Sequence, residues 1–112
     1  MTTQLNWAQL CQTVNAATAT AVYGPVPSGS QVSITAASAW NPSTAAGSAV
    51  VDLFVVPSAG SAADVTHLDR VSVPVGSALT LVNAINHKLT AGMTLYAITN
   101  GATLTISGAV AS

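Results

Sequence analysis

Charged residues are the scarcest feature of this chain of 112 residues, which has three acidic and two basic side chains and no glutamate. They make up 4% of the sequence, whereas an ordinary soluble domain has about 25%. A surface with so little charge has little electrostatic protection against association. We therefore expect much of the surface to contact other protein subunits. The alternative is a monomer kept in solution by its many uncharged polar side chains.

The same shortage excludes several classes of partner. One lysine and one arginine cannot neutralise the phosphates of a nucleic acid or bind an acidic membrane surface. The longest apolar run, residues 49–56, is broken by Asp52 and is far shorter than the roughly 18 residues that cross a bilayer. Residues 1–10 lack the basic start and the continuous apolar stretch of a secretion signal. We therefore expect the chain to be made in a cytoplasm and kept there until assembly or lysis, with no nucleic acid or membrane among its partners.

Residues that carry chemistry are almost as rare. The single cysteine, Cys11, has no second cysteine for a disulfide or a zinc site, and we interpret it as a small buried hydrophobe. A hydrolytic triad would need His67 or His87, and neither lies in a recognisable motif. Only three aspartates could supply a glycosidase pair, and residues 64–69 offer too few ligands for a metal ion. We expect no enzymatic activity, no cofactor and no metal.

Alternation with period two dominates the rest of the sequence and predicts short, half-buried strands separated by Gly, Pro and Asn turns. The expected strands are 18–23, 31–40, 48–56, 68–73, 79–81, 93–99 and 103–110. Residues 82–89 are ambiguous, with one helical turn as an option. This number of strands predicts one all-β domain, an antiparallel two-sheet β-sandwich of the jelly-roll-like kind, over residues 18–112.

Three details of this arrangement follow from the local pattern. Residues 31–40 place Val32, Ile34, Ala36 and Ser38 on one face of a strand. Residues 48–56 are nearly apolar on both faces, which predicts a central strand covered on two sides. The dipeptide Asn100-Gly101 is a strong hairpin signal because both residues tolerate positive φ, so we expect strands 93–99 and 103–110 to pair with each other.

The first 17 residues do not alternate cleanly, and we interpret them as an N-terminal arm outside the sandwich. This arm carries Leu5, Trp7, Leu10 and Val14, which are the predicted partner-binding residues. They could pack on the domain's own sheet or cross to a neighbouring subunit, and the sequence does not choose between these. Trp7 is the natural anchor for a neighbour, because buried aromatic side chains dominate interface energies.

Several strand and turn segments resemble small structural proteins of tailed bacteriophages. The resemblance spans about residues 18–108. It rests on AVYGP at 21–25, AWN at 39–41, VDLFVVPSAGSA at 51–62, VGS at 75–77, LTAGMTLYA at 89–97 and LTISG at 104–108.

The resemblance implies a component of the virion. One such role is a capsid decoration (cement) protein that stabilises the shell by non-covalent packing against the major capsid protein or another virion protein. The scarcity of charge predicts a homo-oligomer, and the same resemblance favours a trimer. A tail or fibre domain that binds a host glycan or receptor is the alternative, although packing explains Tyr23, Trp40, Phe54 and Tyr96, which leaves only Trp7 free as an aromatic platform.

Overall fold

The computed structural model describes residues 4–112 and contains, in this range, nine strands and two single-turn 3₁₀ helices. In chain order the elements are β1 (Leu5–Val14), β2 (Thr20–Tyr23), β3 (Gln31–Asn41), β4 (Ala49–Val56), η1 (Asp64–Thr66), β5 (His67–Val73), β6 (Ser77–Thr80), η2 (Val82–Ala84), β7 (Lys88–Leu89), β8 (Thr94–Ile98) and β9 (Thr103–Ala111). The turn η2 lies inside the segment for which one helical turn was an option.

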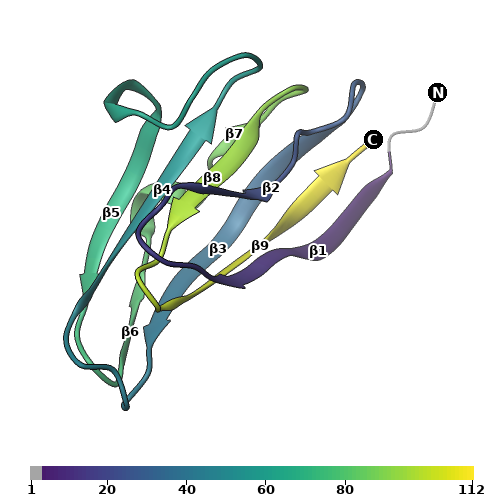
Figure 1. The fold of residues 1–112 in the computed structure, drawn as a ribbon. Helices are drawn as coiled ribbons and strands as arrows, with labels where there is room; N and C mark the ends of the chain where they lie inside the picture. Colours follow the sequence, from purple (N-terminus) through teal and green to yellow (C-terminus); the bar gives the residue numbers. More distant parts are fainter. Residues whose placement is uncertain (1–3) are drawn as a thin grey trace.

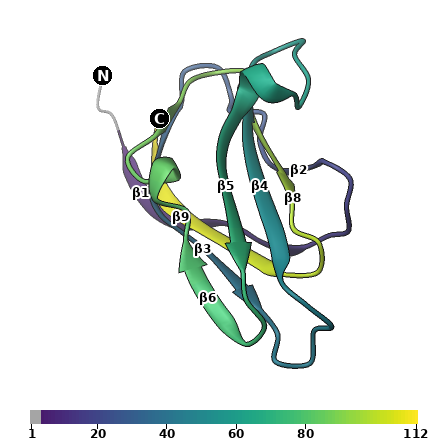
Figure 2. The same cartoon turned by 90° about the vertical axis from the view of Figure 1, so that its left-hand side faces the viewer.

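The strands form two antiparallel sheets that face each other (Figure 1, Figure 2). Sheet A has the order β1-β9-β3-β6, with β7 also pairing with β3, and sheet B has the order β2-β8-β4-β5. Apart from β7, the first strand pairs with the last, the second with the second last, and so on inward to β4 and β5. This nested pairing is the topology of a jelly roll. The predicted all-β, two-sheet sandwich is therefore confirmed.

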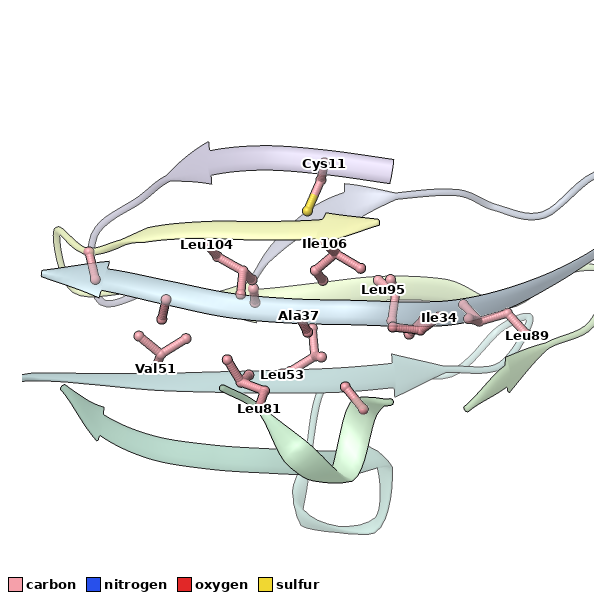
Figure 3. Packing of buried hydrophobic residues seen from close by; sticks show 14 of the residues in the cluster. Cys11, Ile34, Ala37, Val51, Leu53, Leu81, Leu89, Leu95, Leu104 and Ile106 are labelled. Atoms are coloured by element: carbon pink, nitrogen blue, oxygen red, sulfur yellow. The ribbon is translucent and has the colours of Figure 1, made fainter. Parts of the chain in front are cut away.

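The hydrophobic core lies between the two sheets (Figure 3). Alternation along the strands places every second side chain in this core. In β9, Leu104 and Ile106 are fully buried, whereas the polar residues between and beside them are half-buried. Burying each Leu, Ile or Val side chain contributes about 1.5–3 kcal/mol. The largest fully buried apolar side chains come from both sheets and the segments that join them: Val32, Ile34, Val51, Leu53, Val73, Leu81, Leu89, Leu95, Leu104 and Ile106.

Strand β3 is confirmed, but its expected alternation is wrong in the second half. The register against β9 shifts between Ile34 and Ala36, which is the signature of a β-bulge. Val32 and Ile34 face the core as expected, whereas Ala36 is exposed and Ala37 and Ala39 are buried in its place. An extra residue in one strand moves every later side chain to the opposite face.

Strand β4 is a central strand of sheet B, between β8 and β5, and is buried along most of its length as predicted. Val51 and Leu53 point into the core cluster. Phe54 is also buried but lies outside that cluster, because it belongs to the opposite face of the strand. There its ring stacks on His67 with the ring centroids 4.8 Å apart.

The predicted hairpin at Asn100-Gly101 is wrong. Strands β8 and β9 belong to different sheets, so this turn carries the chain across the edge of the sandwich. The main-chain N–H groups of Asn100 and Gly101 donate to the carbonyls of Ala16 and Asn15, at 3.3 and 2.9 Å. The turn is therefore fixed to the segment after β1 rather than to a hairpin partner.

The prediction of an N-terminal arm is also wrong for residues 5–14, which form β1 and pair along their length with β9. The sandwich therefore includes this strand and does not begin at residue 18. The register shifts between Gln9 and Cys11, so the consecutive residues Leu10 and Cys11 both pack toward the core. This bulge broke the alternation on which the sequence interpretation relied. Residues 1–3 of the predicted arm lie outside the described residues.

Candidate interaction surface

The structure brings three of the four predicted partner-binding residues onto one exposed surface. Leu5, Trp7 and Val14 lie on the face of β1 that points away from the core, with 54%, 71% and 58% of their surface exposed. Leu10 is different, because it is half-buried and packs against the core cluster. A side chain at Gly108 would meet Leu10 Cδ1 at 3.1 Å, so Leu10 fills the space that this glycine leaves. Leu10 therefore belongs to the core side.

Strand β1 is also an edge strand. Within residues 4–112, it pairs only with β9, which leaves its other side without a strand. Gln4 and Ser112 exchange both main-chain hydrogen bonds, at 2.9 and 3.0 Å. Because hydrogen-bonded and non-hydrogen-bonded pairs alternate in an antiparallel ladder, Leu5, Trp7 and Gln9 direct their N–H and C=O groups away from β9. The free edge therefore presents a regular row of donors and acceptors beside two exposed apolar side chains.

The outer face of sheet A extends this surface across β9 and β3. It has small or polar side chains at Ser38, Thr103, Thr105 and Ser107, and an exposed indole at Trp40, which is 46% exposed. The charged side chain in this sheet is Lys88 on β7, whose Nζ donates to Ser33 Oγ at 2.9 Å. Uncharged hydroxyl groups cost less to desolvate than charged groups do, provided that a protein partner supplies hydrogen bonds to them.

The other charged residues lie on the side of sheet B. Asp52 Oδ1 is 3.2 Å from Arg70 Nε and 2.8 Å from His67 Nε2, although the ring N–H is not aligned for a hydrogen bond to that oxygen. Among the described residues, His67 Nε2 is a buried side-chain nitrogen without a hydrogen-bond partner. The cluster covers Phe54 and fixes β5 against β4.

Asp69 has a structural role. Its carboxylate accepts hydrogen bonds from the main-chain N–H groups of Arg70 and Asn83, at 2.8 and 3.1 Å, and from Asn83 Nδ2 at 3.1 Å. These bonds tie η2 to β5 and satisfy a buried charge. The described residues contain no group of three or more His, Cys, Asp or Glu side chains that could hold a metal ion.

Cys11 is buried, as the sequence interpretation predicted. Burial raises the pKa of its thiol to about 11, partly opposed by a hydrogen bond from the main chain at Ile106. At neutral pH the group is therefore a protonated thiol, which is a poor nucleophile.

Two shallow hollows lie at the ends of the sandwich. One, of about 460 Å³, is bounded by Gln31, Thr90 and Ser112, and the other, of about 390 Å³, by Pro42, Thr44 and Asn100. No aromatic side chain lines either hollow. Tyr23 and Tyr96 are half-buried in sheet B. Trp7 is thus the most exposed aromatic ring in the described chain, and it stands on the open edge rather than in a hollow.

Sequence reasoning missed two parts of this surface. It did not find Gln9 and the free edge, because which strand ends at the border of a sheet depends on the whole topology. It also missed the outer face of sheet A, although the alternation of Thr103, Thr105 and Ser107 with buried residues was a usable signal. No protein-family model matches this chain, and a search of curated proteins finds no match. None of the helices in residues 4–112 has the length and apolar character of a membrane span.

Proposed function

We propose that this chain is a non-enzymatic structural subunit that works by packing into a larger protein assembly, and that the assembly is the particle of a tailed bacteriophage. The observation that carries the proposal is the combination of an open β1 edge with the outer face of sheet A, on which Lys88 is the one charged side chain among the described residues. Single exposed hydrophobic residues are ordinary on soluble proteins. Exposed Leu5 and Trp7 lie beside main-chain groups that have no partner strand, and this combination favours association. Most proteins protect their sheet edges against such pairing.

The choice of a phage particle rests on the resemblance of residues 18–108 and on an analogy of fold. Jelly rolls occur in viral capsid proteins and also in lectins and cupins, so the fold by itself does not assign a function. Within the particle we propose the role of a capsid decoration protein, which reinforces the shell by non-covalent contact with the major capsid protein. Contact area and hydrogen bonds, rather than ion pairs, would hold the major capsid protein on this surface, because the outer face of sheet A has few charged side chains.

The test is to locate the chain in particles purified from its source by electron cryomicroscopy with a labelled antibody. Label distributed over the shell supports the decoration role, and absence from intact particles refutes the proposal. Label on the tail favours the second candidate, a glycan- or receptor-binding domain, for which the exposed Trp7 ring is the supporting observation. In that case, saccharide binding should be abolished by Trp7→Ala and retained by Trp7→Phe.

A further inference from the structure

We propose that β1 is a self-association edge through which two copies of this chain pair antiparallel about a twofold axis at Trp7. The two A sheets would then join into one continuous sheet. This inference deepens the proposed assembly role and rests on it, because it specifies the first contact between subunits.

The main chain of β1 already has the geometry that such pairing needs. The segment from Gln4 to Gln9 is regular in register against β9, and the bulge begins only after Gln9. Leu5, Trp7 and Gln9 point their N–H and C=O groups to the open side. An antiparallel partner strand would satisfy these groups with about six main-chain hydrogen bonds.

The other edges of the two sheets are poorly suited to pairing with β1. Sheet A ends on its far side at β6 and β7, which have four and two residues. In sheet B, β2 has four residues and leads into Gly24-Pro25, and β5 carries Asp69 and Arg70. Short strands, proline and charge are the devices that keep sheet edges from pairing. Strand β1 has ten residues. It has no proline and no charged side chain, and its bulge begins only after Gln9.

A second copy of β1 is the partner that fits this edge best. Antiparallel pairing about Trp7 places Leu5 opposite Gln9 of the other copy and brings the two Trp7 side chains side by side on the outer face. In this register, all three residues whose N–H and C=O groups point away from β9 form hydrogen bonds with the other copy. Strand β1 carries no charged side chain, so two identical copies meet without the like-charge repulsion that opposes most self-pairing strands. Aromatic cross-strand pairs add further stability.

Residue-resolved amide hydrogen exchange of the full chain tests the pairing directly. Sedimentation equilibrium first identifies a dilute and a concentrated sample, and the association should be the same at low and high salt because no ions face each other. When nine-tenths of the chains are paired, exchange through the monomer slows about tenfold. We expect this slowing at the N–H groups of Leu5, Trp7 and Gln9. Asn6 and Ala8, which bond to β9, should be protected in both samples.

A pair of matched substitutions separates the edge from the face of the sheet. Trp7→Lys places two ammonium groups opposite each other across the axis, and should weaken association at least about tenfold. Trp40→Lys makes the same change at an exposed indole on the same outer face, but in β3, which has no free edge there. It should leave association unchanged. Circular dichroism confirms that each variant is folded.

Three results would overturn the inference. These are a monomer at every concentration, an association in which the three odd-numbered amides stay unprotected, and equal weakening by both lysine substitutions. None of them bears on whether the chain is found in phage particles, so the edge contact and the proposed function can fail separately.

Discussion

Replacing Thr99 by valine tests the contact that holds the chain where it crosses from sheet B to sheet A. Thr99 is fully buried, and its hydroxyl accepts a hydrogen bond from the main-chain N–H of Asn15 at 2.6 Å. The same hydroxyl lies 2.9 and 2.8 Å from the main-chain and side-chain oxygens of Asn15, to one of which it donates. Valine has nearly the same shape but no hydroxyl, so the Asn15 N–H loses its partner.

The expected cost follows from these contacts. A buried donor left without a partner costs about 1–3 kcal/mol, and the lost donation from the hydroxyl adds about 1 kcal/mol. Because Asn15 is half-buried and water can replace part of this loss, we expect Thr99→Val to lower the free energy of unfolding by about 2–3 kcal/mol. Thr99→Ser keeps the hydroxyl and removes one methyl group, which should cost about 1 kcal/mol.

Urea unfolding, followed by circular dichroism and by tryptophan fluorescence, measures both variants against the wild-type chain. The slope of the transition should be unchanged, so that the shift in midpoint reports stability alone. A valine variant as stable as the serine variant would refute the role of the hydroxyl. It would mean that the turn at residues 99–102 is held by packing only.

Four further outcomes follow from the structure. Gly108→Ala should cost about 2–3 kcal/mol in urea unfolding, because the new methyl group would collide with the Ser33 carbonyl oxygen. Deleting residues 1–17 removes β1 and uncovers the core, so the truncated chain should lose its cooperative unfolding transition; retained cooperativity would show that β1 is dispensable. Phe54→Ala should cost about 3 kcal/mol, and an unchanged melting temperature would show that the ring is solvated. The raised pKa of Cys11 predicts that stability falls as pH rises from about 9 to about 11, and Cys11→Ala should remove this part of the pH dependence of the urea midpoint.

The sequence predicted correctly those strands in which one pattern of polar and apolar residues continues over many positions. Strand β4 was recognisable from an apolar segment that only Asp52 interrupts, and β9 from the alternation of polar and apolar residues at 103–107. Both patterns reflect burial of one or two faces, which is local information. The two bulges defeated the same reasoning, because one additional residue at Leu10 or near Thr35 inverts the faces without changing the composition.

Local sequence patterns could not predict to which of the two sheets each strand belongs. The turn at Asn100-Gly101 suits a hairpin as well as a crossing between sheets, and the choice depends on hydrogen bonds between Asn15 and Thr99, which are 84 residues apart. The candidate site shows the same limit. Leu5, Trp7 and Val14 could be selected as unexplained apolar residues, but their place on an open edge depends on the last strand of the chain, β9. Their binding of a partner stays a prediction.

The hydrogen bonds between Gln4 and Ser112 nearly close the described chain into a ring, with both ends at the same corner of the sandwich (Figure 1). Chains whose ends lie together tolerate circular permutation. A short linker between these ends, with new termini cut in the exposed segment 42–48 that joins β3 to β4, should give the same sandwich with a different order of strands. A fused domain can then be attached either at the original terminus or at the new one. A large domain attached at Ser112 stands beside the β1 edge and should obstruct pairing there, whereas one attached at residues 42–48 lies at the opposite end of the sandwich and should leave that edge open.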